Sequence, residues 1–311
     1  MQARALCKGI SVFFLIALLF LSCSKTNTNN SSPGTDTGDT PLTEDTQKTS
    51  DLPDLAEAIA RFSREMVNVN PDSEAFVEDF LRWFFGEAGI PDRFARSIAT
   101  SVLASPAFFM EFFMLLDQDP YTYYLVDKQH PLPEGYEPAD LVPLTAGIYR
   151  ISRNDLMLRK IAADALREMA LAASAEGVVF EIGSTYRSAA YQAQVYDREV
   201  KTYGKETADR QSAQPGRSQH QLGLVVDFAP IDDAFAKTPA SQWLSQNAGR
   251  FGWSLSFPEG FEDATGYRYE SWHYRYVGKD LAAFINTYFE GIQQYALQFI
   301  HAWQEPAAEI R

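Results

Sequence analysis

The sequence is poor in the residues that build cross-linked or metal-rich scaffolds, with two cysteines and four histidines among 311 residues. Positive charge is also scarce: 27 Lys and Arg stand against 41 Asp and Glu, for a formal net charge of -14. A chain this acidic has no general attraction for phosphate backbones, so nucleic acid is not expected as a partner. No repeat of about 20 to 50 residues is visible, which argues against a solenoid. What is present, 46% hydrophobic and 22% charged residues, is typical of a globular protein of roughly two domains.

The longest apolar run, residues 10–21, is shorter than the roughly 20 residues that a membrane-spanning helix needs. Basic residues precede it and small residues follow it, which predicts a signal peptide over residues 1–22. The letters FLSC at residues 20–23 resemble the lipobox of bacterial lipoproteins, although Phe20 stands where Leu is commoner. The resemblance implies that Cys23 is lipidated and that the protein is an exported, membrane-anchored lipoprotein facing the periplasm or the cell exterior. The other cysteine, Cys7, lies inside the signal peptide, so no disulfide is expected.

Two segments separate Cys23 from the region that carries the chemistry. Residues 23–52 are polar and predict a disordered tether that begins at the lipidated cysteine. Residues 53–118 have apolar side chains at three-to-four spacing and predict a module of four helices, with Asn70 and Ser105 as N-caps before proline. This module has no histidine, and its rows of phenylalanine indicate packing or an unknown partner.

The remaining region, residues 119–311, alternates between strand and helix patterns. Prolines up to residue 143 exclude a long helix, and residues 121–126 are expected to be extended. Helices are predicted over residues 154–175, 188–203 and 281–303, and strands over residues 178–182, 224–228, 253–257 and 272–277. Helices and strands in this irregular order predict an α+β fold, with a small sheet and flanking helices, and not a doubly wound parallel sheet.

Two of the four histidines belong to motifs. His220 and Asp227 lie in the pattern S-x-H-x-x-G-x-x-x-D, and His273 ends the pattern E-x-W-H. A catalytic zinc site takes three protein ligands and keeps one open position, and these two histidines and one aspartate supply that set. Seven residues of straight strand would separate the first two by roughly 23 Å. The chain must therefore bend between them, and Gly223 is the residue best suited to permit the bend.

Glu270 begins the second motif, three residues before His273. A carboxylate beside an activated water can accept its proton and pass it to a leaving amine, so Glu270 is the candidate base. A single histidine is more often a satisfied core residue, and a single glutamate is more often a solvated charge. The combination favours a site, because the four fixed residues of the first motif match by chance at only about 10⁻⁵ of positions.

These motifs, together with Tyr186, Arg187, Ser188 and Gln192, closely resemble the zinc D-alanyl-D-alanine carboxypeptidases of the VanY type. The likeness covers residues 126–289 and is absent from residues 53–118. It implies a small antiparallel sheet, as in the LAS metallopeptidases, and action on the peptide stems of peptidoglycan. The resemblance also implies the following roles: His220, Asp227 and His273 as zinc ligands, Glu270 and Arg187 as catalytic residues, and Ser188, Gln192, Ser218 and Trp272 as substrate contacts. His130 and His301 match no catalytic position and are expected to be structural or surface residues.

The expected function is removal of the terminal D-Ala from stem peptides by a zinc enzyme tethered to the membrane. The same chemistry leaves L,D-carboxypeptidase, D,D-dipeptidase and endopeptidase action open. A different class would be a metal-bearing but inactive lipoprotein that binds cell wall. The presence of Glu270 argues against that class, because a binding module needs no base beside its metal.

Overall fold

The computed structural model describes residues 75–105 and 107–304. The predicted signal peptide, Cys23, the tether and the helices before residue 75 lie outside the described residues. The described chain forms two compact units, one of residues 75–109 together with 302–304 and one of residues 110–301.

The first unit is helical, as predicted. It contains α3 (Ala75–Glu87), α4 (Asp92–Ala104), the start of α5 (Ala107–Leu116) and the end of α13 (Gln293–Gln304). Nε of Arg82 lies 2.7 Å from the Asp92 carboxylate and joins α3 to α4. Ser105 accepts a hydrogen bond from the backbone nitrogen of Ala107, the N-cap role expected for it. No single helix in the described ranges is long and apolar enough to cross a membrane; only α4 and α5, as a bent pair, satisfy length and composition together.

The division between the units falls after residue 109, whereas the sequence pattern predicts the helical module to end at residue 118. The packing of aromatic rings explains the difference. Phe109 packs on Trp303 at 6.4 Å between ring centroids, within the first unit. Phe112, one turn further along α5, packs on Phe299 at 5.0 Å and on Phe284 at 6.4 Å, within the second unit.

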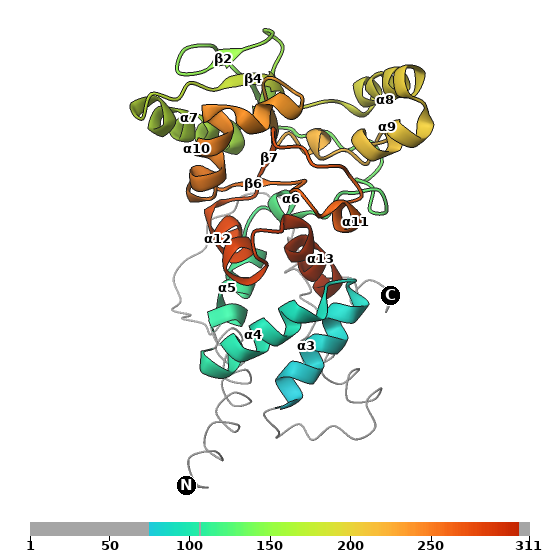
Figure 1. Ribbon diagram of the computed structural model, residues 1–311, viewed down its shortest axis with the longest axis vertical. Coiled ribbons are helices and arrows are strands. Elements are labelled where there is room, and N and C mark those ends of the chain that lie inside the picture. Colours follow the sequence, from blue (N-terminus) through green and yellow to red (C-terminus); the bar gives the residue numbers. More distant parts are fainter. Residues whose placement is uncertain (1–74, 106, 305–311) are drawn as a thin grey trace, which may run out of the picture. The chain divides into compact units, whose positions relative to one another are not determined.

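The second unit contains a five-stranded sheet in the order β2-β4-β5-β7-β6 and a two-stranded sheet of β1 and β3. Figure 1 labels β2, β4, β7 and β6 of the larger sheet. The strands are β1 (Leu141–Pro143), β2 (Arg150–Ile151), β3 (Met157–Arg159), β4 (Glu181–Ser184), β5 (Val225–Phe228), β6 (Trp253–Leu255) and β7 (His273–Tyr276). All pairings are antiparallel except that of β2 with β4. The predicted α+β class and small antiparallel sheet are confirmed, with one parallel edge strand.

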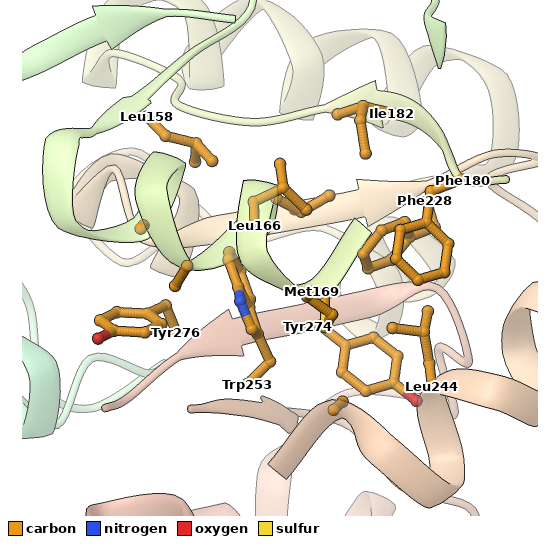
Figure 2. Packing of buried hydrophobic residues seen from close by; sticks show 14 of the residues in the cluster. Leu158, Leu166, Met169, Phe180, Ile182, Phe228, Leu244, Trp253, Tyr274 and Tyr276 are labelled. Carbon is orange, nitrogen blue, oxygen red and sulfur yellow. The ribbon is translucent and has the colours of Figure 1, made fainter. Parts of the chain in front are cut away.

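The helices of this unit, besides the remainders of α5 and α13, are α6 (Pro120–Tyr123), α7 (Lys160–Ala175), α8 (Ala189–Tyr203), α9 (Lys205–Gln211), α10 (Pro239–Asn247), α11 (Glu262–Thr265) and α12 (Lys279–Tyr288), with 3-10 turns η1 (Gln219–Leu222), η2 (Asp233–Lys237) and η3 (Ala248–Phe251). The apolar side of α7 packs on the sheet, and Figure 2 shows Leu166 and Met169 near Phe228 and Tyr274 of two neighbouring strands. Leu224, Val226 and Phe228 belong to this core, so alternation along β5 turns Asp227 to the other face of the sheet.

Several predicted elements differ from the structure. Residues 120–123 form α6, where extended chain was expected, because Asp119 caps a turn that has Pro120 at its first position. The helix predicted from residue 154 begins at Lys160, since Met157–Arg159 pair with β1 instead. The single closing helix is two helices, interrupted where Glu290 and Gly291 have φ of 54° and 78°. The strand predicted over residues 178–182 lies at residues 181–184.

A buried arginine fixes the start of this unit to the sheet. Arg275 of β7 is fully buried, and its Nη2 donates hydrogen bonds to the backbone carbonyls of Tyr121, Thr122 and Tyr124 at 2.9 to 3.1 Å. Burial lowers the pKa of its guanidinium to about 9. These bonds hold α6 against the strand that also carries His273.

Candidate active site

The middle strands of the sheet bring the predicted ligands together. Asp227 of β5 and His273 of β7 are register partners on adjacent antiparallel strands. His220 comes from η1, and Gly223 ends that turn with a left-handed φ of 69°, which makes the bend that the sequence required. One ligand atom from each of the three residues lies within 4.8 Å of the others.

Hydrogen bonds orient the first imidazole. Nδ1 of His220 lies 2.7 Å from the backbone oxygen of Thr185, which can only accept, so the proton sits on Nδ1 and Nε2 keeps its lone pair. Nε2 in turn lies 3.1 Å from the Asp227 carboxylate. Burial, with the Arg187 charge, lowers the pKa of His220 to about 4, so this imidazole is neutral and able to bind a metal.

The aspartate between the two rings has an unused oxygen. Burial alone would raise the pKa of Asp227, but His220 and His273 hold it well below its usual range. Oδ1 lies 3.1 Å from Nδ1 of His273, yet it is buried and accepts no hydrogen bond within the described part of the chain. A buried anionic oxygen without a donor is costly. The donor set and this oxygen fit a divalent metal ion, and two imidazoles with one carboxylate match zinc.

Glu270 lies at the edge of this group, with one carboxylate oxygen 3.5 Å from Nδ1 of His273. It is 8% exposed. Burial, together with the negative charge of Asp227, raises the pKa of Glu270 to about 8. A carboxyl group with a shifted pKa and a place beside the predicted ligands is suited to exchange protons with a reacting group.

Arg187 reaches the same group from the segment between β4 and α8. Its Nη2 lies 2.8 Å from both Asp227 Oδ2 and His220 Nε2. Nη1 donates to Gln192 and Nε donates to Ser184, at 3.2 and 3.1 Å. A metal on His220 would displace this guanidinium from Nε2, and the other two bonds would keep it beside the centre.

A cavity of about 510 Å³ opens over these residues, and it lies within the second unit. It is lined by nearly all the predicted site residues, namely Arg187, Gln192, Ser218, His220, Asp227, Glu270, Trp272 and His273. Ser188 does not line it. The Ser188 hydroxyl instead accepts from the backbone nitrogen of Tyr191 and caps α8.

The other residues singled out in the sequence also form structural hydrogen bonds or ring contacts. Gln192 is buried and donates to the carbonyl of Ala213, so it holds Arg187 as well as lining the cavity. Ser218 caps η1 through the backbone nitrogen of His220. His130 binds Asp127 and its ring packs on His301, in keeping with the structural role expected for both histidines.

Sequence reasoning missed two neighbours of the ligands. Thr185 acts through its backbone oxygen, which no side-chain pattern reveals. Gln219 lies between two motif residues and lines the cavity, and its side chain contacts the ring of His273. A buried amide beside a ligand becomes visible only when the strands are placed.

Comparisons with known proteins give the same family as the motifs. The family described as VanY, D-alanyl-D-alanine carboxypeptidase, matches residues 155–279, a range that contains all the cavity residues named above. YodJ of Bacillus subtilis, which carries the name of a carboxypeptidase, is 38% identical over 55% of this chain and 67% of its own length. A D-alanyl-D-alanine carboxypeptidase of Enterococcus faecalis is 32% identical over 57% of this chain and 65% of its own. The solved LdcB LD-carboxypeptidase is 37% identical over 56% of this chain and 89% of its own, with a TM-score of 0.50.

Proposed function

Because the chain belongs to the VanY family of D-alanyl-D-alanine carboxypeptidases and is thus a peptidase, we propose that it removes the terminal D-Ala from peptidoglycan stem peptides with a bound zinc ion. The observation that carries the proposal is the group of His220, Asp227 and His273, whose ligand atoms lie within 4.8 Å of one another and which lines a cavity together with Glu270.

His220, Asp227 and His273 would hold the zinc. When bound, the ion would polarise the scissile carbonyl and lower the pKa of a water molecule to about 7. Glu270 would accept the proton of the attacking water and deliver it to the nitrogen of the departing D-Ala. Glu270 lies 3.5 Å from Nδ1 of His273 and lines the same cavity, which is the place that this transfer requires.

Arg187 would bind the free C-terminal carboxylate or the oxygen that gains negative charge during attack. Its planar guanidinium offers paired donors to either group. Gln192 and Ser184 would hold this side chain in place. Ser218 and Trp272 line the same cavity and would contact the substrate.

A second candidate is L,D-carboxypeptidase action, in which the bond before the terminal D-Ala follows an L-residue. The 37% identity to the LdcB LD-carboxypeptidase favours it. D,D-dipeptidase and endopeptidase action use the same centre. A non-catalytic lipoprotein that binds cell wall is the least favoured alternative, since Glu270 stands beside the ligands.

We also propose export and membrane anchoring through lipid on Cys23. Its support is the short apolar run that ends in FLSC at residues 20–23. The substrate lies outside the cytoplasmic membrane, so such an address would bring the protein to it.

The test is a digest of purified peptidoglycan, read by mass spectrometry, with zinc-loaded protein. Stems ending in D-Ala-D-Ala should lose one alanine, and tetrapeptide stems report the L,D activity separately. Chelator should stop the reaction, and added zinc should restore it. The control is His273→Ala, which lacks one ligand. Loss of alanine that is unaffected by chelator and by His273→Ala would overturn the zinc assignment, and no loss at all would overturn the activity.

A further inference from the structure

A second cavity of about 330 Å³ adjoins the one that holds the metal-ligand group. The two share Ser212, Arg217 and Tyr267 as lining residues. The second is completed by Lys128, Asp209 and Gln214. A peptide in the first cavity can therefore continue into the second, which we name the Lys128–Arg217 cavity.

Both cations line this cavity, and Arg217 Nη1 donates a hydrogen bond to the backbone oxygen of Lys128. The nearby Arg210 and Arg268 pair with Glu262 and Asp233. Neither Lys128 nor Arg217 forms an ion pair with any carboxylate of residues 75–105 or 107–304.

The nearby acidic groups already have partners. Asp209, which lines the cavity, accepts from Lys205 and from the Tyr196 hydroxyl, each at 2.5 Å. Glu199, in the larger cavity, accepts from Gln211 at 2.7 Å. The Lys128–Arg217 cavity thus offers two positive charges that form no ion pair within the described residues, in a protein whose formal net charge is -14.

A series of aromatic contacts sets an upper limit on the distance between the Lys128 ammonium and the metal-ligand group. The Lys128 ammonium lies 4.7 Å from the Tyr267 ring centre, which lies 4.9 Å from that of Phe257, which lies 4.6 Å from that of His273. An extended peptide advances roughly 3.3 to 3.6 Å per residue, so at most about four residues cover these steps, and fewer if the steps do not lie on one line.

We propose that the Lys128–Arg217 cavity is a subsite for a second carboxylate of the substrate, two or three residues before the scissile bond. The inference rests on the proposed function, since it concerns the same peptide. Lysine and arginine without acidic partners are the side chains that recognise such a group. This carboxylate is distinct from the C-terminal one assigned to Arg187.

The experiment compares two synthetic stems, L-Ala-γ-D-Glu-L-Lys-D-Ala-D-Ala and the same peptide with the α-carboxylate of its second residue amidated. With zinc-loaded protein, the acidic stem should have a KM about fivefold lower, as expected for partly exposed ion pairs, and a similar kcat. Added salt should reduce the difference. Lys128→Gln and Arg217→Gln should each shrink the KM ratio toward one. Lys160→Gln, an exposed lysine of α7 that lines neither cavity, should keep it.

Arg217→Gln also loses the hydrogen bond to the Lys128 backbone, so the melting temperature of this variant is measured. If Arg217→Gln is unfolded, Lys128→Gln alone provides the comparison, because the Lys128 side chain is exposed. Equal KM values for both stems, or an unchanged ratio in Lys128→Gln, would overturn the subsite. If neither stem is cut, the proposed function fails. The subsite is then tested on its own, by calorimetric measurement of the binding of both stems to zinc-loaded protein. Tighter binding of the acidic stem then supports the subsite, and equal binding overturns it.

Discussion

The side-chain oxygen of Gln219 lies 3.3 Å from Nε2 of His273 and accepts a hydrogen bond from the Ser256 hydroxyl at 2.7 Å. An acceptor at this place keeps the proton of His273 on Nε2. Nδ1, which faces Asp227, is then left with its lone pair for a metal.

Replacing Gln219 should therefore weaken metal binding. We expect Gln219→Leu to lower zinc affinity about 10- to 100-fold, the usual cost of losing a partner behind a ligating histidine. Gln219→Glu keeps an acceptor and should bind at least as tightly as wild type. Chelator competition measures the affinities, and circular dichroism of the metal-free proteins checks the fold. Equal affinity in Gln219→Leu would show that Gln219 does not orient His273.

Glu270→Gln should keep the fold and the zinc but lose about 10²- to 10⁴-fold in kcat, because the amide preserves shape and removes the proton acceptor. Single-turnover assays on the pentapeptide stem, with metal content measured on the same sample, separate the two effects. If the variant retained more than about a tenth of wild-type kcat, another residue would be the base.

Arg187 should discriminate between free and blocked C-termini. A stem amidated at its C-terminus should be cut at least about 100-fold more slowly than the free acid, and Arg187→Ala should erase that difference as well as slow the reaction. Arg187→Ala retains all three ligands, so its zinc content serves as the control. Equal cleavage of both stems by wild type would mean that Arg187 stabilises only the transition state, or that the protein acts as an endopeptidase.

Asp127 should stabilise the peptidase unit in a pH-dependent way. Burial would raise its pKa, but hydrogen bonds from the His130 side chain and from the backbone of Gln129 and His130 lower it to about 2. Gln294 of α13 donates to its second oxygen at 2.9 Å. The folded pKa is below the ordinary 3.8, so the stabilisation is complete above pH 3.8 and is lost as the pH falls toward 2.

We expect Asp127→Asn to lower the free energy of unfolding by about 2 kcal/mol at pH 7. The difference from wild type should shrink between pH 4 and pH 2. Urea titrations across this range measure it, with the exposed Asp155→Asn as a matched control. A difference that stays constant down to pH 2 would mean that the ionised carboxylate is not the source of the stability.

Cys23→Ser should move the protein from the membrane fraction to the soluble fraction, because the lipid would be lost and the tether is polar. Fractionation followed by a high-salt wash measures the change, and Cys7→Ser is the control. Retention of Cys23→Ser in the washed membranes would point to an uncleaved apolar segment or to docking through residues 53–118.

The sequence predicted the ligand group because its spacing is restrictive. Only a sharp bend lets His220 and Asp227 meet, and Gly223 lies at that bend with a left-handed backbone. Helix α8 was also predicted nearly to the residue, because Ser188 and Gly204 mark its ends. The residue roles themselves stay predictions until the variants above are measured.

Other features could not be predicted, for physical reasons. Strands β1, β2 and β3 have two or three residues each, too few to show alternation. The break between α12 and α13 depends on Glu290, a residue that rarely adopts a positive φ. The carboxylate Oδ1 of Asp227, which lacks a donor within the described residues, appears only when β5 and β7 are paired.

The order β2-β4-β5-β7-β6 places β7, the last strand within residues 75–304, in the interior of the sheet. Ribosomal synthesis therefore delivers β5 and β6 before the strand that joins them, and both keep an open edge until residues 273–276 emerge. The same strand supplies His273 and the buried Arg275, whose partners were made about 150 residues earlier. Such non-local pairing makes folding slow and concentrates it at the end of synthesis. A chain cut short before residue 273 would lose in one step the strand that joins β6 to β5 and the predicted metal ligand His273.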